Sequence, residues 1–239
     1  MASETKEVSL SVIANKIAST KRDFDVGNDI AFLDGVLTKL ECGLFIEYIR
    51  CKGYEGSFAS ADLSEVLWRR MRGKFPFMRT VDDVGELWTC VGISPEIQFV
   101  QDEVKMGRSV DESDEYLSSD KCIMFNALVY LNTIDPDKGG VTNFPDYSFR
   151  VQAKSRLAVV YKRSIFRYKD EPSTMDKRRY LKLRFVYKLQ NTKFPQQRQR
   201  LFELEQQAII NEIGQVEDKK ITAEIEDIHD KMCKEFQNM

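Results

Sequence analysis

Hydrophobic and polar positions repeat with different periods in successive parts of the chain. Between residues 37 and 72, apolar residues recur every three or four positions, which predicts two helices. From Pro95 to about residue 190 the period falls to two, which is typical of strands whose side chains alternate between two faces. Helical spacing returns after Pro195. Helices followed by about five antiparallel strands predict an α+β fold with a β-sandwich or barrel core.

These changes divide the chain into three predicted segments. Residues 1–27 are expected to form an arm or a short amphipathic helix, with apolar residues Val8, Leu10, Val12, Ile13 and Ile17. Residues 28–192 form the predicted barrel domain, and residues 193–239 form an amphipathic helix or a helical hairpin with a break near Gly214. The narrow apolar seam of the last segment suits either packing on the protein itself or coiled-coil pairing with a partner.

Local signals set the expected ends of the first elements. A strand is predicted from Asp29 to Leu33, and the helix that opens at Leu37 is expected to stop at Gly53. Asp62 and Glu65 have the three-residue spacing of a capping box, which predicts that the second helix begins there.

The stretch from Met124 to Pro145 joins a continuous apolar run to a turn rich in Asp, Pro and Gly. The run ends in Tyr130-Leu131-Asn132, and Gly139 and Gly140 can adopt the positive φ angles of a tight reversal. Read alone, this stretch predicts an ordinary β-hairpin.

Composition narrows the class of protein. A chain of 239 residues that is 42% apolar can bury a sizeable core. Its five cysteines are odd in number and form no CxxC motif, which favours a reducing compartment over a disulfide framework. The sequence has no apolar run of 18 residues and no signal-peptide pattern at its start. We therefore expect an intracellular protein with no membrane span, most simply a cytoplasmic one.

The net charge of −2 hides an uneven distribution. Between Arg150 and Arg200 there are sixteen Lys and Arg against three acidic residues. Such a segment is either a solvated basic face balanced by acidic neighbours or a contact surface for phosphates, nucleic acid or another polyanion. The low sequence pI of about 5.7 weighs against a dedicated nucleic-acid protein.

The strand predicted from residue 179 to residue 188 alternates most clearly. One face carries Arg179, Leu181, Leu183, Phe185 and Tyr187, and the other carries Arg178, Tyr180, Lys182, Arg184 and Lys188. Because the first set is mostly apolar, we expect it to point into the barrel. The basic members of the second set, Arg178, Lys182, Arg184 and Lys188, would then form an outer contact face.

The order of these pieces resembles the prolyl 4-hydroxylase-like branch of the Fe(II)- and 2-oxoglutarate-dependent dioxygenases. The phrases that carry the resemblance lie between residues 28 and 190 and are, in chain order, Leu37-Thr38-Lys39-Leu40-Glu41-Cys42, Leu67-Trp68-Arg69-Arg70, Glu96-Ile97-Gln98-Phe99, Tyr130-Leu131-Asn132, Gly139-Gly140-Val141-Thr142-Asn143-Phe144-Pro145, Leu157-Ala158-Val159-Val160-Tyr161 and Arg179-Tyr180. The resemblance implies a double-stranded β-helix, a jelly-roll-like barrel, with supporting N-terminal helices and a C-terminal helical extension.

The resemblance also implies an iron site made of two histidines and one carboxylate. The matching positions hold Ser109 and Asp111 for the first His-x-Asp pair and Tyr168 for the second histidine. The chain has one histidine, His229, in the predicted C-terminal helices, so the two-histidine set cannot be formed. Serine and tyrosine are poor ligands for ferrous iron at neutral pH. A changed site could still combine Asp111 with oxygen ligands such as Glu112, Asp114 or Glu115.

For 2-oxoglutarate, the resemblance implies that Arg179 holds the far carboxylate and that the Tyr130 hydroxyl assists it. Three functional interpretations follow. The leading one is a catalytically inactive dioxygenase-like protein, without cofactor, that serves as a binding or scaffold module through its basic face and its C-terminal helix. The alternatives are an active oxygenase that uses Fe(II) and 2-oxoglutarate at an unusual site, and a nucleic-acid-binding or coat-like protein. Without a ligand, a buried Arg179 would need an internal Asp or Glu partner, or would face outward after a one-residue change of register.

Overall fold

The computed structural model describes residues 29–52, 56–101, 109–110, 114–145, 149–164, 167–171, 177–213 and 219–237. The chain forms two compact units. Unit 1 comprises Met1–Pro76, Gly92–Asp114 and Met124–Phe185, and unit 2 comprises Phe77–Val91, Glu115–Ile123 and Val186–Met239. The predicted N-terminal arm, residues 1–27, and the expected helix stop at Gly53 lie outside the described residues. The predicted domain boundaries at residues 27 and 192 stay predictions.

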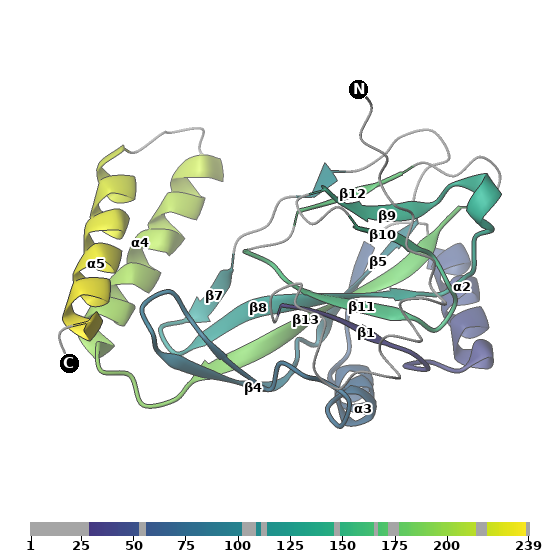
Figure 1. Cartoon of the computed structure of the whole chain (residues 1–239), viewed down its shortest axis with the longest axis horizontal. Coiled ribbons are helices and arrows are strands. Elements are labelled where there is room, and N and C mark those ends of the chain that lie inside the picture. Colours follow the sequence, from purple (N-terminus) through teal and green to yellow (C-terminus); the bar gives the residue numbers. More distant parts are fainter. Residues whose placement is uncertain are drawn as a thin grey trace. The chain divides into compact units, whose positions relative to one another are not determined.

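Unit 1 contains a large sheet built around two long buried strands, β8 (Lys121–Tyr130) and β13 (Arg179–Leu189), whose far ends belong to unit 2. Its strand order runs β1 (Ile30–Leu33), β11 (Ala158–Lys162), β8, β13. On the other side of β13, β5 (Glu96–Gln101) pairs antiparallel with it, and β2 (Gly56–Ala59) pairs with β5 (Figure 1). Every residue of β8 after Lys121 is buried, which explains the uninterrupted apolar run in its sequence.

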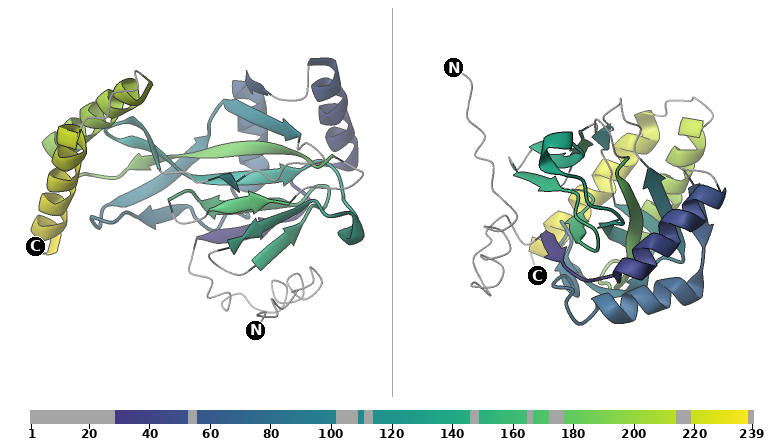
Figure 2. Two further views of the ribbon diagram at one scale, coloured as in Figure 1. Left: turned by 90° about the horizontal axis from the view of Figure 1, so that it is seen from above. Right: turned by 90° about the vertical axis from the view of Figure 1, so that its right-hand side faces the viewer.

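A smaller sheet faces one side of the large sheet. Its order is β10 (Phe149–Gln152), β9 (Val141–Phe144), β12 (Tyr168–Asp170), β6 (Ser109–Val110). In the views of Figure 2 its strands form a layer of their own beside the large sheet. Side chains from both sheets meet in one buried cluster: Val100, Leu128, Tyr130, Ile134, Phe144, Val151, Ala153, Leu157, Val159, Tyr161, Tyr168 and Tyr180. The expectation of an α+β fold with a two-sheet barrel core is confirmed.

Helices cover the opposite face of the large sheet. Trp68 of α3 (Ala61–Met71) contacts Phe185 of β13 edge to face, and Phe75 stacks on the same ring with centroids 4.4 Å apart. The capping prediction for this helix is wrong. Ser60 is the N-cap and accepts a hydrogen bond from the backbone N–H of Leu63.

The reciprocal capping box belongs instead to α2 (Lys39–Lys52). The backbone N–H of Thr38 donates to Glu41 Oε2, and the backbone N–H of Glu41 donates to Thr38 Oγ1. The side chain of Glu41 also accepts two hydrogen bonds from the guanidinium of Arg70 on α3, each 2.8 Å long. One carboxylate therefore caps α2 and ties it to α3.

The turn after Tyr130 is a crossover between sheets, so its interpretation as an ordinary hairpin is wrong. β8 lies in the large sheet and β9 in the smaller one. The connection contains a single 3-10 turn (Pro136–Lys138) and then Gly139 and Gly140 at φ 78° and 71°. The side-chain amide of Gln152 donates to the carbonyls of Ile134 and Gly139, both at 2.9 Å, which fixes the loop against β10.

Unit 2 combines a short hairpin with two C-terminal helices. Strand β3 (Arg79–Val81) pairs with β4 (Leu87–Ile93), and β7 (Glu115–Ser118) pairs with the first residues of β8. The predicted helical hairpin is present as α4 (Pro195–Ile213) and α5 (Lys219–Gln237). Met232 of α5 packs with Val84 and Phe194 in a small core, so this helix packs on its own protein.

A buried arginine fastens α4 within unit 2. The guanidinium of Arg198 forms ion pairs with Asp82 and Glu86, and it lies 5.5 Å from the ring centroid of Trp88. The indole N–H of Trp88 donates to Asp82 Oδ2. No helix in the described part of the chain combines the length and the apolar character needed to cross a membrane.

Candidate functional site

The candidate site is the space between the two sheets of unit 1, and the direction of the β13 side chains decides what lines it. Tyr180 belongs to the core cluster shared with the smaller sheet. Phe185, of opposite parity, packs on Trp68 and Phe75 at the helical face. Because side chains alternate along a strand, even-numbered residues here face the barrel interior. The predicted inward set, Arg179 to Tyr187, therefore points away from the interior, and that prediction is wrong.

Arg178, directly before β13, forms the centre of a buried polar cluster. Its side chain is 0% exposed. Its Nη2 lies 2.7 Å from Asp170 Oδ1, and its Nη1 donates to Thr142 Oγ1 at 2.8 Å. Its Cζ also lies 5.5 Å from the ring centroid of Tyr180. A buried ion pair must be closely matched, because neither charge has bulk solvent to stabilise it.

The remaining members of this cluster complete the set of hydrogen bonds. The Tyr130 hydroxyl donates to Thr142 Oγ1 at 2.7 Å, and the Thr142 hydroxyl donates to Asp170 Oδ1 at 3.1 Å. The Tyr180 hydroxyl donates to Asp170 Oδ2 at 3.2 Å. Thr142 thus uses its one donor and both acceptor positions, and Asp170 accepts hydrogen bonds from Thr142 and Tyr180 in addition to its ion pair with Arg178. We call Tyr130, Thr142, Asp170, Arg178 and Tyr180 the interior cluster.

Four strands of the barrel position the interior cluster. Tyr130 is the last residue of β8, and Asp170 is the last residue of β12. Thr142 is the second residue of β9, the strand that begins directly after the two positive-φ glycines. The antiparallel pairing of β12 with β9 places Asp170 opposite Thr142 in register. The cluster therefore depends on the crossover after Tyr130, which brings Thr142 of the smaller sheet within hydrogen-bonding distance of Tyr130 of the large sheet.

The predicted basic contact face is wrong for two of its four members. Arg178 and Lys182 are buried, because their side of β13 is the barrel interior. Arg184 forms an ion pair with Glu96, whereas Lys188 is half-exposed.

The predicted anion-binding pair is divided between two environments. Tyr130 is in the interior cluster as expected. Arg179 is half-buried on the other side, where its Nε donates to Gln101 Oε1 at 2.8 Å. Arg179 therefore faces away from the interior, as the alternative with a one-residue change of register describes. Its neighbour Arg178 is the arginine that pairs with an internal acid.

The positions matched to the iron ligands lie on the smaller sheet or outside the described residues. Strands β6 and β12 pair so that Ser109 is opposite Lys169, next to Tyr168. The Tyr168 side chain is buried and meets Tyr161 edge to face at 5.5 Å. Asp111 and Glu112 lie outside the described residues. His229 lies on α5 of unit 2, where its Nδ1 is 3.9 Å from Cys233 Sγ.

The residues described do not fit the iron site that the resemblance implies. The sequence supplies one imidazole where two are required, and a buried phenol, Tyr168, stands at the position that the resemblance matches to the second histidine. Among the described residues, no group of three or more His, Cys, Asp or Glu side chains is arranged to hold a metal ion. For the far carboxylate of 2-oxoglutarate, the donor set of Arg178, Thr142 and Tyr130 has the right chemistry, but Asp170 already accepts from it.

Sequence reasoning identified Tyr130 but missed Thr142, Asp170 and Arg178 as a unit. Thr142 was visible within the Gly-Gly-Val-Thr turn, and Asp170 shares its face of β12 with Tyr168. A buried acid in alternation with a tyrosine was the available signal for an internal partner of an arginine.

Comparison with known proteins identifies the fold. No family model and no curated protein matches the chain. Among solved structures, the viral collagen prolyl hydroxylase of Paramecium bursaria Chlorella virus 1 superimposes with a TM-score of 0.51 at 13% identity, covering 69% of this chain and 92% of that one. The chain has the fold of a 2-oxoglutarate oxygenase. A prolyl 4-hydroxylase of Pseudomonas putida gives a TM-score of 0.45 at 14% identity, covering 74% of this chain and 98% of that one.

This dioxygenase-like fold confirms the double-stranded β-helix expected from the resemblance, including the helices that follow it. At this level of identity the likeness concerns the fold alone. What the interior does must be argued from its own side chains.

Proposed function

We propose that this protein uses the dioxygenase-like fold as a non-catalytic binding or scaffold module in a protein assembly. The observation that carries the proposal is the interior cluster. Arg178 is fully buried and already paired with a carboxylate of its own chain, so a ligand carboxylate would have to displace Asp170 from this ion pair and from two hydrogen-bond donors. Ser109 and Tyr168, at the positions matched to the iron-binding histidines, are poor ligands for ferrous iron, which also favours a non-catalytic protein.

Displacing Asp170 would be unfavourable for a defined physical reason. The incoming carboxylate offers Arg178 the same charge that Asp170 offers, so the exchange gains little Coulomb energy. The displaced Asp170 would remain buried without its counter-charge, which costs several kcal/mol. We therefore infer that 2-oxoglutarate is not a ligand of this site.

The partner contacts are proposed for exposed apolar side chains on the C-terminal helices. Ile209 and Ile210 on α4 are 48% and 61% exposed. Adjacent large apolar residues in solvent are typical of contact surfaces. The acid-rich composition outside residues 150–200 and the buried Arg178 and Lys182 favour a protein partner over a nucleic acid.

The catalytic part of the proposal is tested by metal analysis and turnover. After purification under anaerobic conditions with ferrous iron, we expect substoichiometric iron and no succinate release from 2-oxoglutarate. Stoichiometric iron together with succinate release would refute the proposal and would favour the active oxygenase with an altered site built on Asp111.

The cosubstrate part is tested by calorimetry with 2-oxoglutarate on three proteins. The wild type and Asp170→Asn, which keeps the side-chain volume, are expected to bind more weakly than about 1 mM. Asp170→Ala removes the internal carboxylate and leaves room beside Arg178, so binding should become measurable. Binding by the wild type as tight as that of Asp170→Ala would show that Asp170 does not block the site.

The binding role is tested by quantitative co-purification from the native source. Ile209→Glu/Ile210→Glu should lose specific partners that the wild type retains. Glu203→Gln, which changes an exposed residue on the same helix, is the matched control and should retain them. Equal partner sets for all three proteins would remove α4 from the proposal.

A further inference from the structure

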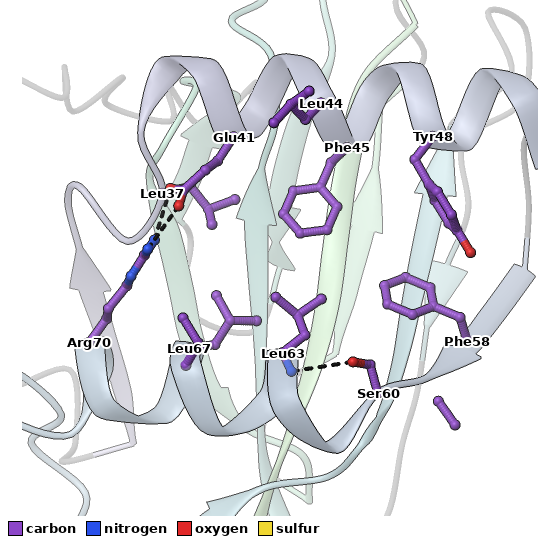
Figure 3. Close-up of a pocket in the computed structure, with 12 residues that line it drawn as sticks. Leu37, Glu41, Leu44, Phe45, Tyr48, Phe58, Ser60, Leu63, Leu67 and Arg70 are labelled. Atoms are coloured by element: carbon purple, nitrogen blue, oxygen red, sulfur yellow. Dashed lines mark hydrogen bonds and ion pairs between the residues drawn. The ribbon is translucent and has the colours of Figure 1, made fainter.

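An apolar groove lies between α2 and α3 of unit 1. It has a volume of about 570 Å³, and its lining includes Leu37, Leu44, Phe45, Tyr48, Leu63 and Leu67. Figure 3 shows the side chains of Leu37, Phe45, Tyr48, Leu63 and Leu67 in the space between the two helices, with the Glu41–Arg70 ion pair bridging one end. A cavity of this size accommodates two or three large apolar side chains.

Three of the lining side chains are unusually exposed for their type. Leu44 is 61% exposed, Tyr48 43% and Val66 40%. At about 25 cal/mol per Å², such apolar surface favours a covering segment. Burial of this apolar surface by an apolar segment would therefore be favourable.

The charges around the groove indicate what kind of segment fits. The three ion pairs on its two helices join Glu41 to Arg70, Glu47 to Arg50 and Glu65 to Arg69. The two charged residues that line the groove, Glu41 and Arg70, form one of these pairs, so the lining carries no net charge to attract a strongly charged peptide. A nearly uncharged apolar segment is the complementary ligand.

We propose that residues 8–17 of the same chain dock in this groove. This segment, Val-Ser-Leu-Ser-Val-Ile-Ala-Asn-Lys-Ile, carries a single charged side chain, Lys16. Leu10, Ile13 and Ile17 have the i, i+3, i+7 spacing of a helix that anchors in a groove. As a helix, the two turns from Leu10 to Ile17 would span about 10 Å. The groove side of α2, from Lys39 to Tyr48, is about 14 Å long, so the segment fits.

The length of chain between the segment and the groove permits this docking. Residues 18–28 connect residue 17 to Asp29, and eleven extended residues reach about 36 Å. Leu37, the first groove residue, follows Asp29 by eight positions, so the two lie at most about 29 Å apart. The tether can therefore span the distance with slack.

Tethering also explains why a short segment suffices. A connection of this length gives an effective concentration on the order of 1 mM at the groove. A Kd of about 1 mM would then give half occupancy, so three anchors need a Kd of only about 0.1 mM to be mostly bound. A free copy of the segment would compete poorly with the attached one.

Hydrogen exchange of the full chain tests the proposal directly. The backbone amides of residues 8–17 should exchange at least threefold more slowly in the wild type than in Leu44→Glu. Leu40→Glu is the matched control, because Leu40 lies on the same helix and is 73% exposed but does not line the groove. Wild-type rates in Leu40→Glu support the proposal, and equal loss of protection in both variants overturns it.

A binding measurement gives a second, independent result. The full-length variant Leu10→Asp/Ile13→Asp/Ile17→Asp leaves the groove unfilled without changing a described residue. A synthetic peptide of residues 5–20 should bind this variant at least tenfold more tightly than the wild type, and adding Leu44→Glu should abolish binding. Equal affinities overturn the proposal. A dimer that depends on Leu44 but not on the three N-terminal residues would identify a second copy as the occupant instead.

Discussion

At the scale of single residues, side chains on both faces of β13 are buried, one set against Trp68 and Phe75 and the other against the smaller sheet. The alternation along its sequence predicted a strand correctly, but the choice of inward face relied on one side being apolar. Polarity then no longer distinguishes the faces, because Arg178 and Lys182 are buried through specific partners.

Asp170 is predicted to contribute strongly to stability through Arg178. Asp170→Asn keeps the shape but leaves the buried guanidinium without its counter-charge, so the free energy of unfolding should fall by about 3–5 kcal/mol. Urea denaturation followed by circular dichroism measures this. Glu171→Gln, which breaks the more exposed pair with Arg150, is the control and should cost about 0–1 kcal/mol. Similar costs for the two variants would contradict the central position of the pair.

Glu41 is predicted to make stability depend on pH in acid. Hydrogen bonds from Arg70, and then from the backbone N–H of Thr38, lower the pKa of Glu41 from 4.5 to about 2. Because its folded-state pKa is depressed, its contribution is complete above the unfolded value of about 4.5 and is lost as pH falls toward 2. The stability difference between wild type and Glu41→Gln should therefore shrink between pH 6 and pH 3. A difference that stays constant over this range would exclude linkage through Glu41.

At the scale of elements, sequence periodicity was reliable where one element buries one clear stripe or alternates regularly. Helices α2, α3, α4 and α5 and strands β1 and β13 lie where the pattern predicted them. The short strands β2 and β3 have few residues and expose most of them, so no period develops. The crossover after Tyr130 has the turn chemistry of a hairpin, and only pairing with distant strands distinguishes the two.

Gly140 is predicted to be essential to that crossover. Its φ is +71°, and an added Cβ would lie 3.0 Å from Ile134 Cγ2, so Gly140→Ala should destabilise the protein by about 1–3 kcal/mol. Gly43→Ala is a matched control on α2, where an added Cβ meets no atom within 4 Å. That change should stabilise the protein by about 0.5–1 kcal/mol. Thermal unfolding of both variants checks the opposite signs, and a loss in both would contradict the argument.

At the scale of the whole molecule, part of the uneven charge of the sequence is buried or neutralised by ion pairs within the fold. Within the basic segment, Arg178 binds Asp170, Arg198 binds Asp82 and Glu86, and Arg150 binds Glu171. Charge counted along a sequence does not show which side chains reach solvent. This is why the fold was predictable from ordered motifs, whereas the basic contact face was not.

The two units are predicted to unfold together, because β4, β8 and β13 each continue from one unit into the other. The protein has two tryptophans, Trp68 in unit 1 and Trp88 in unit 2, so single replacements isolate one reporter for each. Trp88→Phe leaves the fluorescence of unit 1, and Trp68→Phe leaves that of unit 2. Each replacement will shift the midpoint of its own variant, so the comparison is made within one protein.

In each variant, the urea transition seen by fluorescence should coincide with the transition seen by far-ultraviolet circular dichroism, as a two-state process requires. Unfolding one unit alone would interrupt β4, β8 and β13 within their length. Buried backbone N–H and C=O groups of the unit that stays folded would then lose their hydrogen-bond partners. A fluorescence midpoint that separates from the circular dichroism midpoint in either variant would show that the units unfold independently. The interior cluster and the C-terminal helices would then have separate stabilities, and a partner bound at α4 could leave the barrel unaffected.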